Sequence, residues 1–284
     1  RRNIERGVFY YCGLAAEIEI GAMTNTPSKK YPAYKGSWVQ DFLVALVFLT
    51  RLPIRPNFTF DMNALKSACR FFSLVGLIVG GVAGTIYVFA AFIGLPLVVC
   101  AILAVAAQII LTGALHEDAI GDVADGFGGG GDKSKKLEIM RDSRVGTYAV
   151  VTLIIVVGLK VAVLGTLSDP LKGFALLVVA ATISRGLIAW ALYFLPPARE
   201  NGLGHGAGRP EIMAPLTSTV LIVLISILVF GPQIGAVALL SGIVGASIMG
   251  AIAMRQVGGQ TGDVLGAIQQ LAEVCILIAC LAAI

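Results

Sequence analysis

The sequence is poor in charged residues, which make up 13% of its 284 residues and leave a net charge of +4. Soluble domains are about a quarter charged, so a soluble globular enzyme is excluded, and the high apolar content excludes a disordered chain. The two histidines and five cysteines show no CxxC pair and no zinc-ligand spacing, so neither a zinc site nor a disulfide framework is expected. The modest positive charge gives no reason to expect a nucleic acid partner.

Apolar sequence is abundant instead: 57% of the residues are hydrophobic, in runs near or above the ~18 residues that mark a bilayer span. We expect an all-α polytopic membrane protein, with a bundle of about seven transmembrane helices in the lipid bilayer. Residues 41–52 are apolar but too short to span, which predicts a short N-terminal interfacial or re-entrant helix. The expected spans are 73–94, 96–115, 148–167, 173–195, 214–230, 233–253 and 265–284.

The first 38 residues are polar and lack the apolar core of a signal peptide. We expect residues 1–38 to be a disordered N-terminal extension and residues 39–284 to form a single integral membrane catalytic domain. The 34 glycines suit spans that approach one another closely. The same close approach would permit a homo-oligomer.

The connections between the expected spans alternate between short and long ones. The long connections carry nearly all the Lys and Arg residues that flank the spans, so the positive-inside rule places them in the cytoplasm. Any active site should therefore face the cytoplasm. The long connections are 53–72, 116–147, 196–213 and 254–264.

The connection 116–147 is rich in acidic residues and glycine. Asp118, Asp122 and Asp125 are spaced i, i+4, i+7, which puts them within about 60° on one face of a helix, and we expect that helix to continue the preceding span. Like charges at a membrane boundary favour a bound divalent cation, and carboxylate oxygens suit Mg²⁺ or Mn²⁺. Gly126 and the glycines that follow are expected to end the helix and to expose backbone amides to a phosphate.

Glu138 and Asp142 are again i and i+4, which predicts a second carboxylate pair on the next helix and a second metal position. Glu117 is expected to face solvent, and His116 to contact the substrate or to support the metal ligands. The alternative for the whole segment is a solvated acidic loop with a glycine-rich turn.

Further polar side chains lie in later segments. Arg185 interrupts an apolar span, and an intramembrane arginine points to function. Arg199 lies in a glycine-rich connection, and both arginines favour phosphate binding over a structural ion pair. Lys160 also lies inside a span, and a role in the active site and a structural ion pair are equally compatible with its position. The last connection contains Asp263, and Glu273 follows inside the final span.

Together these motifs resemble the cobalamin synthase family, also called adenosylcobinamide-GDP ribazoletransferases. The family signature His-x-Asp-Gly-Leu-Ala-Asp-x-x-Asp-Gly is matched at its charged positions, namely His116, Asp118, Asp122 and Asp125, and at Gly126. Ala119 and Gly121 stand where the family has Gly and Ala, which keeps the aspartates in register. The stretch Leu-Glu-Ile-Met-Lys/Arg-Asp-Ser-Arg-x-Gly is matched from Leu137 to Gly146. The resemblance covers about residues 41–284, and its later motifs match residues 184–185, 196–204 and 258–266.

The resemblance implies a glycophosphotransferase of cobalamin biosynthesis in the bacterial inner (cytoplasmic) membrane. The ribose 3′-hydroxyl of α-ribazole or its 5′-phosphate would attack the diphosphate of adenosylcobinamide-GDP. GMP would leave, and adenosylcobalamin or its 5′-phosphate would form. This is the final assembly of the nucleotide loop, so other cobalamin-assembly enzymes are possible partners.

On this basis the expected roles fall into three groups. Asp118, Asp122 and Asp125 bind Mg²⁺ and stabilise the leaving GMP, with Glu138 at a second metal position. Asp142 is the expected general base, by analogy with CDP-alcohol phosphotransferases. Phosphate or ribazole binding is expected of Gly126, Arg144, Arg185, Arg199 and Asp263.

Three other readings compete with this one. A CDP-alcohol phosphotransferase would place Ala-Arg three residues after the Asp-Gly, where this chain has Gly129 and Gly130. A prenyltransferase would repeat an Asp-rich box, and only Asp263 follows. A cation transporter would place acids at the middle of several spans, whereas the expected acids cluster at the ends.

Overall fold

The computed structural model describes residues 33–60, 62–199 and 208–284. The predicted extension 1–38 lies almost wholly outside these residues, as does most of the glycine-rich connection that follows Arg199. In the described part of the chain every regular element is a helix, and β-structure is limited to two isolated bridges. The predicted all-α fold is confirmed.

A short helical segment precedes the bundle, as predicted. Helix α3 (Trp38–Leu49) begins at Ser37, whose side chain caps its first turn. With 12 residues this apolar helix is too short to span a bilayer. The turns η1 (Met62–Ala64), α4 (Leu65–Ala68) and η2 (Cys69–Phe71) then lead into the first long helix.

Among the described residues, five helices are long and apolar enough to cross a membrane, and a bent pair makes up to six. The predicted number of about seven is reached when the bent pair counts as one span and the two limbs of α12 count as two. Helix α10 is the central helix. In its most apolar stretch 83% of the residues are buried, against 28% in that of α9 and 17% in that of α12. The five are α5 (Phe72–Phe92), α9 (Thr147–Gly165), α10 (Pro170–Phe194), α12 (Met213–Gln256) and α13 (Gly262–Ala283).

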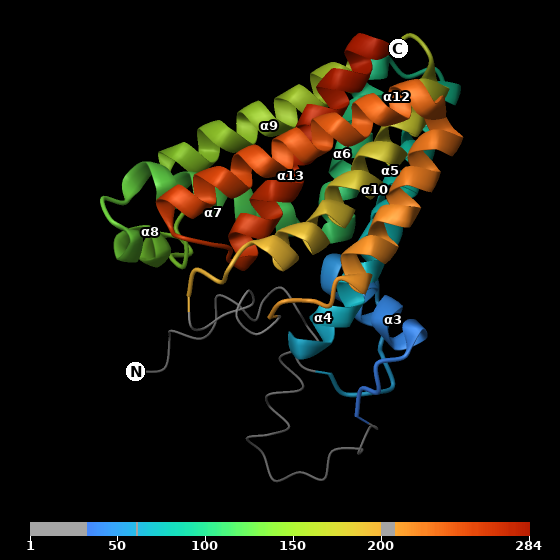
Figure 1. Cartoon of the computed structure of the whole chain (residues 1–284). Helices are drawn as coiled ribbons and strands as arrows, with labels where there is room; N and C mark the ends of the chain where they lie inside the picture. Colours follow the sequence, from blue (N-terminus) through green and yellow to red (C-terminus); the bar gives the residue numbers. More distant parts are fainter. Residues whose placement is uncertain (1–32, 61, 200–207) are drawn as a thin grey trace.

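Helix α12 is broken at one residue. Gly231 has φ 72° and ψ 174°, and Pro232 follows it. A positive φ is readily available to glycine, and proline cannot donate the next helical hydrogen bond. Figure 1 shows the two limbs that result, which meet at a corner near the C-terminus. The limbs correspond to the predicted spans 214–230 and 233–253.

The long and short connections lie at opposite ends of the bundle. At one end, Ala198 N donates to Gln260 O at 2.9 Å, and Lys136 Nζ donates to Gln256 at 2.5 Å. These bonds join three of the four long connections. At the other end Lys172 Nζ donates to the backbone oxygen of Ile284 at 3.0 Å, beside the corner of α12 (Figure 1). The predicted grouping is therefore confirmed for three of the four long connections.

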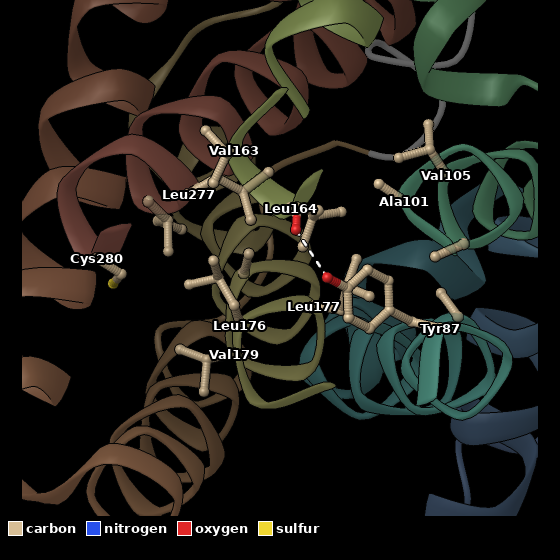
Figure 2. Packing of buried hydrophobic residues seen from close by; sticks show 14 of the residues in the cluster. Tyr87, Ala101, Val105, Val163, Leu164, Leu176, Leu177, Val179, Leu277 and Cys280 are labelled. Atoms are coloured by element: carbon tan, nitrogen blue, oxygen red, sulfur yellow. Dashed lines mark hydrogen bonds between the residues drawn. The ribbon is translucent and has the colours of Figure 1, made fainter. Parts of the chain in front are cut away.

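The core combines large apolar side chains with close backbone contacts. Tyr87 of α5 is fully buried and donates a hydrogen bond to Leu164 O at 2.7 Å, as Figure 2 shows. Helix α5 packs tightly on α10: a Cβ on Gly76 would lie 2.2 Å from Ala181 O. Small residues at such crossings are typical of helix packing in membranes.

Candidate active site

The acidic helix α7 (Leu115–Gly129) does not continue α6 (Leu97–Thr112), because the chain bends by 88° between them. Gly113 and Ala114 both have positive φ at this bend, 65° and 58°. Such a conformation is strained for alanine and persists only where the surrounding structure fixes it. The prediction that the acidic helix extends the span 96–115 is therefore wrong. The bend allows α7 to pack against α13 and α9.

The three aspartates do share α7, as their spacing predicts. Asp118 is exposed, whereas Asp122 and Asp125 are half-buried. The negative charges that act on Asp122 are those of Asp118, Asp263 and Asp125, and the opposing cation is Arg199. Repulsion between like charges in a partly desolvated place favours a bound cation or a bound proton. We call Asp118, Asp122 and Asp263 the acidic cluster.

Asp125 is bonded to backbone amides. Its Oδ2 accepts a hydrogen bond from Gly146 N at 2.6 Å, and its Oδ1 accepts one from Ala149 N at 2.9 Å. These amides belong to the start of α9, so Asp125 caps that helix from another element. A Cβ on Gly146 would lie 2.5 Å from Asp125 Oδ1, so a larger residue there would displace the Asp125 carboxylate. The contacts give Asp125 a structural role that links α7 to α9, and its metal-ligand role stays a prediction.

Asp263 and Arg199 complete the cluster from two further elements. Asp263 lies in the first turn of α13, and its Oδ2 is 3.1 Å from Arg199 Nη2. The segment of Arg199 is held beside the start of α13 because Gln260 N donates to Pro196 O at 2.8 Å. The two residues that the sequence analysis placed at the site therefore lie beside the aspartates of α7.

The predicted second carboxylate pair is not formed. Helix α8 (Lys133–Ile139) contains Glu138 but ends before Asp142, because it lasts only 7 residues. Glu138 is exposed and ion-paired with Lys135 at 3.0 Å, while Asp142 pairs with Arg144. Hydrogen bonds from Arg144 hold the pKa of Asp142 below its usual value. A general base works best with a pKa near the working pH, so this pairing does not support Asp142 as the base.

Gly126 lies inside α7, which runs on to Gly129. The glycines do end this helix, as predicted, but at Gly129, with Gly130 as its C-cap, and not at Gly126. A Cβ on Gly126 would lie 2.4 Å from Met140 Cγ and 3.0 Å from Lys136 O. The contacts of Gly126 are therefore with the α8 region, which packs directly on it.

The donor atoms of the acidic cluster suit Mg²⁺, which prefers carboxylate oxygens. Within residues 33–60, 62–199 and 208–284, however, no three His, Cys, Asp or Glu side chains are close enough to hold a metal together. Mg²⁺ usually takes only one or two carboxylates, and water and substrate phosphates complete its shell. The cluster therefore fits a metal that binds together with a diphosphate.

A second group of charges lies inside the bundle. Lys160 Nζ of α9 is 3.0 Å from Glu273 of α13 and 3.8 Å from Glu117 of α7. Arg185 of α10 is 2% exposed, and the carboxylates that act on it are also Glu273 and Glu117. The expectation that Glu117 faces solvent is wrong, because it is 8% exposed. We call Glu117, Lys160, Arg185 and Glu273 the buried quartet.

Glutamine side chains satisfy the two buried carboxylates further. Gln270 donates to Glu117 at 2.9 Å, and Gln269 donates to Glu273 at 2.7 Å. Gln108 of α6 donates to Glu273 at 3.3 Å. Sequence reasoning missed the glutamines, although polar residues within an apolar span commonly pair with one another.

His116 lies next to this network and is fully enclosed. It is 2% exposed, and neither of its ring nitrogens has a hydrogen-bond partner within the part of the chain that the structure describes. The Nε atom of Arg185 is also buried without a hydrogen-bond partner among the described residues. The predicted contact of His116 with substrate or metal ligands stays a prediction.

The fold and these sites define a polytopic α-helical membrane protein with an acidic cluster at the end where its long connections meet. Its sequence matches the family described as cobalamin-5-phosphate synthase over residues 41–281. A relative from Mesorhizobium japonicum, named adenosylcobinamide-GDP ribazoletransferase, is 39% identical over 84% of this chain and 92% of its own length. Relatives of the same name from Azorhizobium caulinodans and Sinorhizobium medicae are each 41% identical over 84% of this chain, and over 93% and 94% of their own lengths. No solved structure matches this chain.

The chain therefore belongs to the cobalamin-5-phosphate synthase family. The resemblance seen in its motifs is confirmed.

Proposed function

We propose that this protein transfers the adenosylcobinamide-phosphate group of adenosylcobinamide-GDP to α-ribazole or α-ribazole 5′-phosphate, with release of GMP. Family membership over residues 41–281 carries the proposal. The relatives' name specifies adenosylcobinamide-GDP as donor and ribazole as acceptor. The acidic cluster beside Arg199 supports it, because it offers both signs of charge to a diphosphate.

The transfer breaks the phosphoanhydride bond of the donor diphosphate and forms a phosphate ester with the ribose. The ribose 3′-hydroxyl oxygen bonds to the phosphorus on the cobinamide side of the diphosphate, and the bond from that phosphorus to GMP breaks. The hydroxyl proton leaves, and GMP takes the bonding electron pair. Such transfers depend mainly on positioning and on neutralising charge.

Arg199 contacts the acidic cluster and is therefore placed to neutralise phosphate oxygens. Its guanidinium is held 3.1 Å from Asp263, and an arginine so oriented can bind two phosphate oxygens at once. Arg144 pairs with Asp142, which is not part of the acidic cluster, and Arg185 belongs to the buried quartet. We therefore assign the phosphate contact to Arg199 before the other two.

The proposed cofactor is Mg²⁺, or Mn²⁺ in its place, bound by Asp118 and Asp122 with Asp263 beside them. It would supply positive charge to the diphosphate as GMP departs. The chain's own residues hold the site: Asp125 fixes α7 to α9, and Arg199 restrains Asp263. Glu138 is not included, since it is exposed and paired with Lys135.

We further propose that the acidic cluster faces the cytoplasm of a bacterial inner membrane. The end that carries the cluster also carries Lys133, Lys136, Arg141 and Arg255, whereas the opposite end has Lys172. Cytoplasmic connections are enriched in Lys and Arg. Adenosylcobinamide-GDP would then reach the site from the cytoplasm.

The test is GMP release by detergent-purified protein given adenosylcobinamide-GDP, α-ribazole 5′-phosphate and Mg²⁺. Asp122→Asn should lower the rate by about 100-fold or more, because it removes charge that the reaction needs, and EDTA should abolish it. Asp169→Asn is the matched control, since Asp169 caps α10 at the opposite end, and its rate should stay within about twofold. No GMP from folded wild-type protein would overturn the proposal.

A further inference from the structure

We propose that Lys160 is a positioning residue for the acidic helix: through Glu117 it fixes the place of α7 and hence of Asp118 and Asp122. The inference rests on the proposed function in one respect, since it takes the acidic cluster as the site. Lys160 itself lies on α9, inside the bundle and away from solvent. It would act without touching the substrate.

The contacts between α7 and α13 form a continuous series. Asp263 lies near Asp118, and one turn along α13 a Cβ on Gly266 would come within 2.4 Å of Ala119 Cβ. One further turn along, Gln270 donates to Glu117 at 2.9 Å. Glu117 immediately precedes Asp118 in the sequence, so any movement of Glu117 moves the first residue of the acidic cluster.

Lys160 joins the two helices of this series from a third one. Its ammonium group lies 3.8 Å from Glu117 on α7 and 3.0 Å from Glu273 on α13. Two carboxylates brought this close without a cation would repel each other, and buried charges are costly unless paired. Lys160 is therefore the group that lets both carboxylates occupy one region of the interior.

The two carboxylates would respond differently to loss of the lysine. The Glu273 side chain is 1% exposed and keeps Gln108 and Gln269 as donors, whereas the Glu117 side chain is 11% exposed and keeps Gln270. Without Lys160, Arg185 would be the one cation of the buried quartet beside two carboxylates, and the group would carry a net negative charge. Glu117, at the start of α7 beside the 88° bend, is the one that can leave, and α7 would turn with it.

The test measures metal binding without turnover, by EPR titration of Mn²⁺ into detergent-purified protein with adenosylcobinamide-GDP and no ribazole. Mn²⁺ bound by the substrate alone is subtracted. Lys160→Met should raise the Mn²⁺ dissociation constant about tenfold, as loss of a supporting partner does at other metal sites. Lys160→Arg, which keeps the charge, should recover most of the affinity.

Controls separate this effect from loss of stability and from failure of the proposed function. Asp41→Asn breaks another buried ion pair, 3.3 Å from Arg70, and should lower the melting temperature without changing Mn²⁺ affinity. Wild-type affinity in Lys160→Met, beside a loss in Asp122→Asn, would overturn this inference alone. Absence of Mn²⁺ binding by the wild-type protein would overturn the metal site and this inference with it. If Lys160→Met does not fold, Glu117→Gln replaces it, because it removes the charge and keeps the side-chain size.

Discussion

Ala119 of α7 lies so close to Gly266 of α13 that a Cβ on the glycine would come within 2.4 Å of the alanine Cβ. The crossing of the two helices has no room for a methyl group on residue 266. Gly266→Ala should therefore push the helices apart, with an expected loss of about 1–3 kcal/mol in the free energy of unfolding and slower GMP release. Thermal unfolding in detergent and the GMP assay measure the two effects.

Gly158→Ala is the control for that substitution. Gly158 lies within α9, and a Cβ there would meet nothing within 4 Å. Alanine favours a helix over glycine by about 0.5–1 kcal/mol, so this variant should be as stable as the wild type or more so. If Gly266→Ala and Gly158→Ala had equal free energies of unfolding and equal rates of GMP release, the crossing of α7 and α13 would not be tightly packed.

Asp125→Ala should remove the hydrogen bonds to Gly146 and Ala149, because it takes away the acceptor that caps α9. Loss of such a cap costs about 1–2 kcal/mol, which a lowered melting temperature would report. Asp125→Asn keeps one acceptor oxygen and should retain more stability and most of the turnover. A turnover as low as that of Asp122→Asn would instead make Asp125 a metal ligand.

Asp142→Asn should keep GMP release within about threefold of the wild type, because a carboxylate whose pKa is lowered by its partner is a weak proton acceptor. The partner is Arg144, and its hydrogen bonds lower the pKa of Asp142. The assay is the initial rate at saturating donor and acceptor. A hundredfold fall would restore Asp142 as the general base.

Tyr87→Phe should lower the free energy of unfolding by about 1 kcal/mol, since it deletes one buried hydrogen bond. The lost bond is the one from the Tyr87 hydroxyl to Leu164 O, in the core between α5 and α9 (Figure 2). Neither residue lies in the acidic cluster, so the rate of GMP release should not change. A change in rate at equal stability would show that this part of the core acts on the site.

The spans were predictable because their length and apolar content depend on local sequence alone. The expected span 73–94 corresponds to Phe72–Phe92, and 265–284 to Gly262–Ala283. The bend at Ala114 was not predictable in the same way. Alanine favours helices, and its left-handed conformation is imposed by the packing of α7 against other helices.

The candidate site was predictable where it depends on spacing within a helix, and less so where it depends on distant partners. Asp118 and Asp122 share one face of α7 as their register requires. Glu117 was misplaced because its donor Gln270 is 153 residues away in sequence. Asp142 was placed on a helix that in fact ends at Ile139.

The buried quartet contains two anions and two cations, so its formal charges sum to zero. An electric field across a membrane does work on net charge that moves through it. A cluster without net charge that moved as a unit would therefore be little affected by such a field. The buried quartet should therefore give the protein little sensitivity to membrane voltage.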